Sequence, residues 1–193
     1  MQIILASSSP RRQELMKMFN VPFEVIVKNT KEELDSSKSV YEQCMHIAYE
    51  KAMAVYQDIK DDVVVIGSDT IVSFNNKIYG KPKDYDDAFH MLKEFSGNCH
   101  EVISSLCVLI RKNGREYQEL TYDKCDVHVN IMNDSEIEEW INSSDVYTKA
   151  GAYAIQEGYG KYVEKIDGDY FSIVGFPIHK LYEILKKYDV LKK

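Results

Sequence analysis

The sequence has little cysteine, no block of basic residues and no long apolar run. Its four cysteines form no C-x-x-C pair and suit neither a zinc site nor a disulfide framework, so we expect reduced thiols in a cytoplasmic protein. No apolar stretch approaches the length of a membrane-spanning helix, and residues 1–6 lack the basic start of a signal peptide. These absences predict a protein that is neither exported nor bound to a membrane.

The charge balance argues against one large class of partner. The chain has 31 acidic residues against 24 basic ones, a formal net charge of −7, and the few lysines near the C-terminus do not make a basic face. Proteins that bind nucleic acid polymers usually carry such a face, so we expect no partner of this kind. A polyanionic ligand must therefore be bound by a small local cluster of positive charge.

The pattern of apolar residues predicts an α/β fold with a mixed sheet flanked by helices. Residues 1–193 are expected to form a single domain, because no internal repeat or low-complexity linker divides them. Strands are expected at 2–6, 23–27, 63–67, 71–74, 77–79, 162–166 and 170–174, with a hairpin of 102–111 and 117–129 around Asn113-Gly114. Helices are expected at 10–19, 40–56, 85–95, 135–141 and 177–188, and a loop at 28–38.

A serine-rich turn followed by two arginines is the first candidate site. Ser9 suits the N-cap of a helix, and Pro10 suits its first position. Arg11 and Arg12 then lie at the end of the helix where the dipole disfavours cations, unless an anion compensates them. The hydroxyls of Ser7 and Ser9, the backbone N–H groups and the guanidinium groups would together bind a polyphosphate. An ordinary capped helix with two solvated arginines explains the pattern equally well, and the turn is not a Walker A loop.

An aspartate inside an apolar strand is the second candidate. Residues 63–72 are apolar except for Gly-Ser-Asp-Thr at 67–70, and a carboxylate at the end of a buried strand needs a partner such as a divalent cation or a lysine. Strand ends in α/β sheets also border ligand sites. Asp69 is therefore a candidate metal ligand, a candidate general base for water, or both. A turn aspartate that bonds its own backbone is the simpler alternative.

Two lysines and a glycine-rich segment complete the candidates. Lys51 lies on the apolar face of its expected helix, where a lysine stem often packs while its ammonium reaches water. Lys81 lies in a turn, and with the two arginines these lysines would supply the positive cluster that the acidic chain needs. Segment 149–156 has small residues that let backbone approach a ligand, and Gln156 offers a donor and an acceptor to a base edge. A packed structural turn explains the segment as well.

Seven short motifs follow one another along almost the whole chain. They are Leu-Ala-Ser-Ser-Ser-Pro-Arg-Arg-Gln-Glu-Leu (5–15), Gly-Ser-Asp-Thr-Ile-Val (67–72), Gly-Lys-Pro (80–82), Ser-Gly (96–97), Lys-Ala-Gly-Ala-Tyr-Ala-Ile-Gln (149–156), Ile-Asp-Gly-Asp-Tyr-Phe (166–171) and Gly-Phe-Pro (175–177). Each motif alone is weak, but the ordered set resembles the Maf family of nucleotide pyrophosphatases, also called septum-formation proteins. The resemblance implies a fold like that of inosine-triphosphate pyrophosphatases, with a long curved mixed sheet and two lobes around a central cleft.

The resemblance also implies a catalytic residue and a base preference. Asp69 matches the catalytic aspartate of the family. Arg11, Thr70 and Gln156 match three positions linked to substrate specificity, and their combination is similar to the branch that acts on dTTP and UTP rather than on 7-methyl-GTP. Glu157 departs from the glycine expected after Gln156, and an acidic side chain at this position could alter the base pocket.

Phosphate and metal positions follow from the same resemblance. Arg12, Lys51 and Lys81 match positions expected to bind phosphates, and Glu33 matches a glutamate expected near the metal. We therefore expect a divalent cation, Mg²⁺, Mn²⁺ or Co²⁺, bound by Asp69 and Glu33, because oxygen ligands suit all three ions.

These inferences combine into one hypothesis with two alternatives. The hypothesis is a nucleoside triphosphate pyrophosphatase that converts dTTP, UTP or modified pyrimidine nucleotides to the monophosphate and pyrophosphate. The first alternative is a nucleotide-binding regulator of cell division with little hydrolysis of its own. The second is a general phosphatase that releases orthophosphate. The resemblance also suggests a homodimer.

Overall fold

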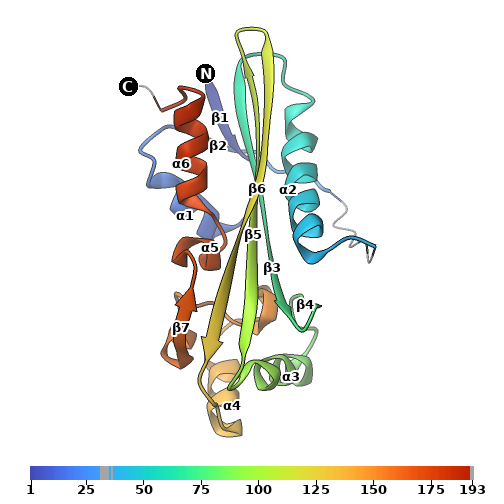
Figure 1. Cartoon of the computed structure of the whole chain (residues 1–193), viewed down its shortest axis with the longest axis vertical. Helices are drawn as coiled ribbons and strands as arrows, with labels where there is room; N and C mark the ends of the chain where they lie inside the picture. The colour runs from blue at the N-terminus through green and yellow to red at the C-terminus, as the bar shows by residue number, and fades with distance from the viewer. Residues whose placement is uncertain (31–34, 36, 192–193) are drawn as a thin grey trace. The chain divides into compact units, whose positions relative to one another are not determined.

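The computed structural model describes residues 1–30, 35 and 37–191, and it confirms an α/β fold with a mixed sheet (Figure 1). The strands are β1 (Gln2–Leu5), β2 (Glu24–Val25), β3 (Val63–Phe74), β4 (Lys77–Tyr79), β5 (Cys99–Lys112), β6 (Arg115–Val129) and β7 (Val163–Asp167). The α-helices are α1 (Pro10–Lys17), α2 (Val40–Tyr56), α3 (Tyr85–Phe95), α4 (Asp134–Ser143), α5 (Tyr170–Val174) and α6 (Ile178–Lys187). Short 3₁₀ helices are η1 (Val146–Thr148), η2 (Ala150–Ala152) and η3 (Gly158–Tyr162).

The sheet contains both parallel and antiparallel pairs. Its order is β2-β1-β3-β5-β6-β7, with β4 beside β3. Strand β1 pairs in parallel with β2 and β3, whereas β4 pairs antiparallel with β3 and β7 antiparallel with β6. The predicted turn between β5 and β6 is confirmed: Asn113 and Gly114 both have positive φ, 52° and 72°, as the tight hairpin turn requires.

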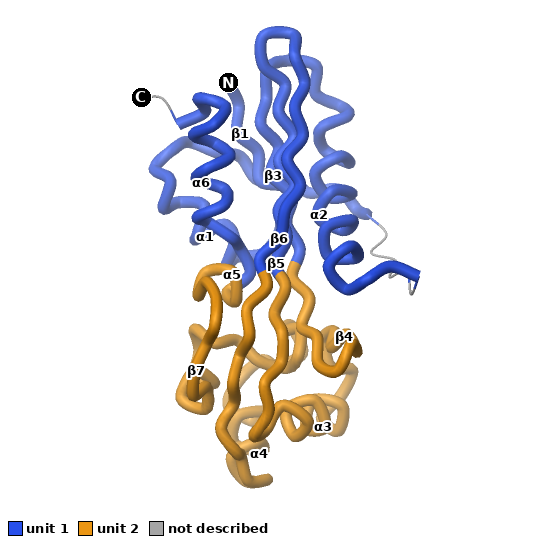
Figure 2. Tube along the Cα trace, in the orientation of Figure 1, with its two compact units in different colours: residues 1–69, 104–123, 175–193 blue, residues 70–103, 124–174 orange. Residues whose placement is uncertain are grey.

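The chain divides into two compact units, each assembled from separate stretches of sequence (Figure 2). Unit 1 contains residues 1–69, 104–123 and 175–193, and unit 2 contains residues 70–103 and 124–174. Strands β3, β5 and β6 each contribute residues to both units. The predicted central cleft concerns the placement of the two units and stays a prediction.

Unit 1 has a core on each face of its strands, because successive strand residues point to opposite faces. The first core joins the strands to α1 and α6 and includes Ile3, Leu5, Val64, Ile66, Leu106, Val108, Met16, Leu181 and Leu185. The second joins them to α2 and includes Ile4, Ala6, Val63, Val65, Cys107, Leu109, Ala48, Ala52 and Val55. Figure 1 shows α2 on one side of these strands and α1 with α6 on the other.

Helix α2 follows the predicted pattern closely. It begins with a capping box, in which Ser39 accepts from the Glu42 backbone while the Glu42 carboxylate accepts from the Ser39 N–H. Its buried face includes Cys44, Ala48, Ala52 and Val55, at the spacing of three or four residues expected for a helix. Within the described residues, no helix has the length and apolar character needed to cross a bilayer.

One predicted element is wrong. Residues 170–174, expected to be a strand, form the short helix α5. The reason is Asp169: its carboxylate accepts from the backbone N–H of Phe171 at 3.2 Å and from the hydroxyl of Ser172 at 3.0 Å, and its carbonyl accepts from the N–H groups of Ser172 and Ile173. These bonds start a helix, and they override the strand preference of the apolar and aromatic residues that follow.

Unit 2 has an aromatic core of its own. Phe95, Trp140, Tyr153 and Tyr159 are buried together, and the rings of Tyr153 and Tyr159 lie 4.4 Å apart between centroids. Trp140 is the only tryptophan of the chain. This core fixes the end of α4 and the segment of η2 and η3, which carries the predicted specificity residue Gln156.

Candidate active site

A buried ion pair joins helix α2 to strand β3. The ammonium of Lys51 lies 2.8 Å from a carboxylate oxygen of Asp69, and the two side chains are only 17% and 12% exposed. The lysine therefore does not extend to bulk water, as the simpler interpretation of its position would have it. Instead it supplies the partner that an aspartate inside an apolar strand requires.

Gly67 explains how the two elements come close enough for this pair. A Cβ atom at position 67 would lie 2.2 Å from the carbonyl oxygen of Ala48 and 2.8 Å from the backbone nitrogen of Ala52. Only glycine therefore allows α2 to approach β3 at this point. Because Asp69 follows Gly67 by two residues, it points to the same face of the strand and meets Lys51 there.

A second polar layer lies beside Asp69. The Ser105 hydroxyl donates to the carbonyl oxygen of Cys44 at 2.7 Å and accepts from the Cys44 thiol at 3.2 Å. Burial, and next the charge of Asp69, raise the pKa of the Cys44 thiol to about 12. The thiol is therefore protonated at neutral pH and is not a nucleophile.

The serine-rich turn forms a separate network around the start of α1. Ser9 is the N-cap, as predicted, and accepts from the Arg12 N–H at 3.5 Å. The Ser7 hydroxyl accepts from the Ser9 N–H and from the Arg12 guanidinium, both at 3.3 Å. Arg12 also donates through Nε to the carbonyl of Gly175 at 2.9 Å. Its guanidinium thus joins the first turn of α1 to the segment before α6.

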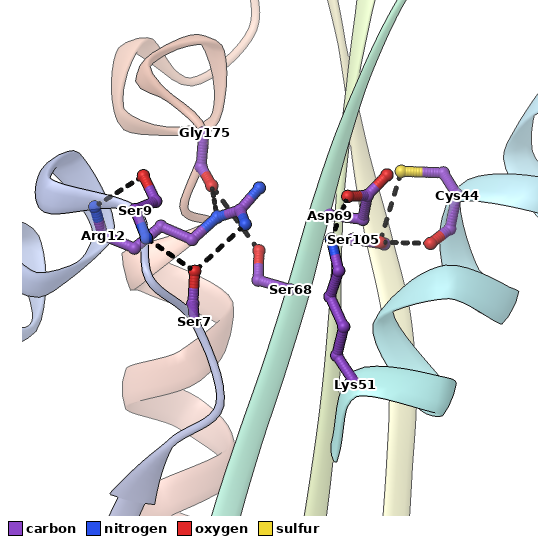
Figure 3. A network of polar contacts seen from close by, with 9 residues as sticks. All are labelled: Ser7, Ser9, Arg12, Cys44, Lys51, Ser68, Asp69, Ser105 and Gly175. Atoms are coloured by element: carbon purple, nitrogen blue, oxygen red, sulfur yellow. Dashed lines mark hydrogen bonds and ion pairs between the residues drawn. The ribbon is translucent and has the colours of Figure 1, made fainter. Parts of the chain in front are cut away.

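Figure 3 shows these two networks on the two sides of β3. Ser68 donates to the carbonyl of Gly175 at 3.5 Å, on the side of Arg12, whereas Asp69 points to the side of Lys51. The alternation of neighbouring strand residues produces this arrangement. A single pocket that combines Arg12 with Lys51 therefore stays a prediction.

The other predicted residues lie in several places. Arg11 is half-buried at the start of α1 in unit 1. Thr70 is half-buried on β3, and Lys81 and Gln156 are exposed, all three in unit 2. Glu33 lies outside the described residues. The described contacts thus bring together Lys51 with Asp69, and Ser7 and Ser9 with Arg12, while the roles of the others stay predictions.

Four residues of these networks were missed from the sequence. Ser68 and Ser105 are fully buried polar residues inside apolar strands, the same signal that singled out Asp69. Gly67, within a run of β-branched residues, is typical of a strand that another backbone approaches closely. Gly175, with φ of 116°, gave no signal beyond its place in the Gly-Phe-Pro motif.

Comparison with known proteins found a family model, similar sequences and a solved structure. Residues 2–188 match the family model described as Maf-like protein. A protein of Thermoanaerobacter sp. (strain X514) named dTTP/UTP pyrophosphatase is 43% identical, over 97% of this chain and 96% of its own. One of the same name from Alkaliphilus oremlandii is 42% identical over the same shares. The solved Ham1 protein of Staphylococcus aureus has a TM-score of 0.48 and 12% identity, and the match covers 97% of this chain and 100% of that chain.

Proposed function

The chain belongs to the Maf-like protein family, and on this premise we propose that it hydrolyses nucleoside triphosphates, dTTP and UTP first, to the monophosphate and pyrophosphate. The observation that carries the proposal is the buried pair of Asp69 and Lys51, which gives the matched catalytic position an oriented carboxylate. Relatives named dTTP/UTP pyrophosphatase, aligned over 97% of the chain, support the substrate class.

The proposed reaction is one displacement at phosphorus. Asp69 takes a proton from a water molecule, whose oxygen forms a bond to the α-phosphorus. The bond from that phosphorus to the oxygen bridging toward the β-phosphorus breaks, and pyrophosphate leaves with the electron pair. Lys51 holds the Asp69 carboxylate in one orientation and, being cationic, also stabilises negative charge on the phosphates.

Further residues are assigned to the substrate in the same proposal. Ser7, Ser9 and Arg12, with the N–H groups at the start of α1, bind phosphate oxygens, and Lys81 adds a further positive charge. Arg11, Thr70 and Gln156 set the base preference. Arg12 also has a structural role, because its bond to the Gly175 carbonyl holds the segment from which α6 starts.

Asp69 offers a carboxylate ligand to a divalent cation. Among the described residues, no three His, Cys, Asp or Glu side chains lie in an arrangement that could hold a metal ion. Cations such as Mg²⁺ in nucleotide sites are nevertheless commonly held by one or two carboxylates together with the substrate phosphates. Asp69 offers such a carboxylate, and Glu33 is the second in our proposal, for Mg²⁺, Mn²⁺ or Co²⁺. When bound, the cation would neutralise phosphate charge.

Two further properties belong to the proposal on the strength of the sequence and the family resemblance. They are a cytoplasmic location and a homodimer. Cell fractionation tests the first, and light scattering of the purified protein tests the second.

Product analysis tests the proposed reaction. Purified protein is incubated separately with dTTP, UTP, CTP, GTP and ATP, with Mg²⁺ or with chelator, and pyrophosphate and orthophosphate are measured. We expect cation-dependent pyrophosphate, fastest from dTTP and UTP. Orthophosphate as the first product would instead identify a phosphatase, and tight nucleotide binding without either product would favour the regulator of cell division.

A further inference from the structure

An ion pair joins the two ends of the segment that carries Gln156. The Lys149 ammonium lies 3.3 Å from a carboxylate oxygen of Glu157 and donates to the carbonyl of Asp145 at 2.5 Å. The lysine side chain is only 6% exposed, whereas the glutamate is 40% exposed. The same carboxylate oxygen accepts from the Ser144 hydroxyl at 3.1 Å. Residues 149–157 therefore form a loop whose ends are tied by charge.

The middle of this loop is fixed by a different set of contacts. Gly151 and Ala152 have positive φ, 67° and 63°, a strained conformation for alanine that neighbours must maintain. The Gly151 N–H donates to the Gly80 carbonyl at 3.0 Å, and the indole N–H of Trp140 donates to the Ala152 carbonyl at 3.0 Å. Tyr153 bonds His100 at 2.7 Å. These anchors end before Gln156. Beyond them the backbone N–H of Glu157 donates to the Ala154 carbonyl at 3.1 Å, and the Glu157 carboxylate is the side-chain group next to Gln156 that ties the turn to Lys149.

The geometry of Glu157 also explains why a side chain is tolerated where the family resemblance implies glycine. Its φ of −100° and ψ of −169° are ordinary for any residue, so glycine is not required. Its carboxylate is bonded to Lys149 and Ser144, both within or next to its own loop. Glu157 therefore neutralises a buried lysine.

We propose that Glu157 is a positioning residue for Gln156: through Lys149 it closes the loop 149–157 and so holds the Gln156 amide in the orientation that selects the base. The assignment of Gln156 to the base rests on the proposed function. Loss of the Glu157 charge leaves Lys149 buried without a counter-charge, and the loop relaxes to hydrate it. The amide of Gln156 then loses its fixed orientation, which weakens nucleotide binding more than it slows the chemical step.

The test uses Glu157→Gln, which keeps the shape of the side chain, and Glu157→Gly, which removes it. Glu139→Gln is the matched control, because Glu139 pairs with Lys161 at 3.2 Å on the exposed surface of the same unit. We expect Glu157→Gln to raise KM for UTP by about threefold to tenfold and to leave kcat nearly unchanged. This magnitude lies between the effect of losing an exposed ion pair and that of losing a buried one. The preference for UTP over CTP is expected to narrow, and Glu157→Gly to show the larger effect of the two.

Trp140 provides a readout that does not require hydrolysis. As the only tryptophan, and bonded to the loop at Ala152, it is expected to change its fluorescence emission when the Glu157 charge is removed, and not in Glu139→Gln. In a Lys149→Met background the Glu157→Gln effects are expected to disappear, because the pair no longer exists. Unchanged KM and emission in Glu157→Gln would overturn the proposal.

Base preference and Trp140 emission together distinguish a positioning role of Glu157 from direct contact with the substrate. A changed base preference with unchanged Trp140 emission would mean that Glu157 contacts the substrate directly, which also contradicts the proposal. If the wild-type protein released no pyrophosphate from any nucleotide, the proposed function would fail by itself. The emission and the thermal stability of the double-mutant cycle would still decide whether Lys149 and Glu157 hold the loop.

Discussion

The ammonium of Lys51 and the carboxylate of Asp69, 2.8 Å apart, join a helix to a strand at a point where only glycine lets the two backbones meet. The contact depends on two separate features of the sequence. Gly67 removes the side chain that would keep α2 away, and the strand alternation directs Asp69 toward α2. Substitutions of Asp69, Lys51 and Gly67 each test one part of this arrangement.

Replacing Asp69 by Asn should remove the general base and largely keep the fold. We expect the rate of pyrophosphate release to fall by about a thousandfold, within the usual contribution of general base catalysis. The thermal midpoint should fall by only a few degrees, because the amide keeps the volume and one hydrogen bond to Lys51. Asp123→Asn is the control, since Asp123 pairs with Lys180 at 3.0 Å in the same unit. Activity retained in Asp69→Asn would remove Asp69 from the mechanism.

Replacing Lys51 by Met should affect both binding and chemistry. The variant keeps the apolar stem but leaves Asp69 without its cation, so we expect KM to rise and kcat to fall, with kcat/KM lower by about a hundredfold. Lys17→Met serves as the control, because Lys17 pairs with Glu14 on the exposed surface of α1. Steady-state kinetics with UTP measures the effect, and a wild-type kcat in Lys51→Met would contradict the orienting role.

Replacing Gly67 by Ala should separate α2 from β3. The added Cβ would lie 2.2 Å from a backbone carbonyl, which cannot move without shifting the helix. We expect a loss of about 3 kcal/mol in the free energy of unfolding, the upper range for overpacking, measured by urea denaturation. Gly80→Ala is the stability control, because a Cβ there meets nothing within 4 Å. Equal stability of the two variants would show that the close approach is not required.

A buried histidine predicts how stability depends on pH. Burial lowers the pKa of His100 to about 3, so the folded protein keeps it neutral. The unfolded chain binds the proton below pH 6.5, and stability supplied by the neutral form is therefore complete above pH 6.5 and lost as the pH falls toward 3. As the pH falls over this range, the free energy of unfolding of His100→Gln should fall less than that of the wild type. The difference should grow by roughly 1.4 kcal/mol per pH unit.

Urea denaturation at pH 7, 6, 5 and 4 measures this difference. His179→Gln is the control, because His179 is exposed on α6. Parallel pH profiles for His100→Gln and the wild type would contradict the burial of a neutral histidine.

Local signals in the sequence predicted most of the fold. Asn113-Gly114 located the hairpin, and the spacing of Cys44, Ala48 and Ala52 located α2, because these patterns depend on neighbouring residues alone. Residues 170–174 were predicted wrongly, because the apolar and aromatic side chains indicate a strand while Asp169 starts a helix through its own bonds.

The contacts of the site were less accessible to prediction. The sequence indicated that Asp69 needs a partner, but not which cation would supply it, since Lys51 precedes it by 18 residues and meets it only when α2 packs on β3. Arg12 was expected to face a ligand, and its bond to Gly175 joins residues 163 positions apart. Such contacts are set by the tertiary fold, which no local pattern encodes.

Hydrolysis of UTP in ¹⁸O-labelled water tests the central claim most directly. Mass spectrometry of both products shows which phosphorus atom the water attacked. Attack at the α-phosphorus, with Asp69 as the base, predicts one ¹⁸O atom in the uridine monophosphate and none in the pyrophosphate. Asp69→Asn is expected to form the labelled monophosphate about a thousandfold more slowly. Label in the pyrophosphate, or labelling by Asp69→Asn at the wild-type rate, would contradict the account.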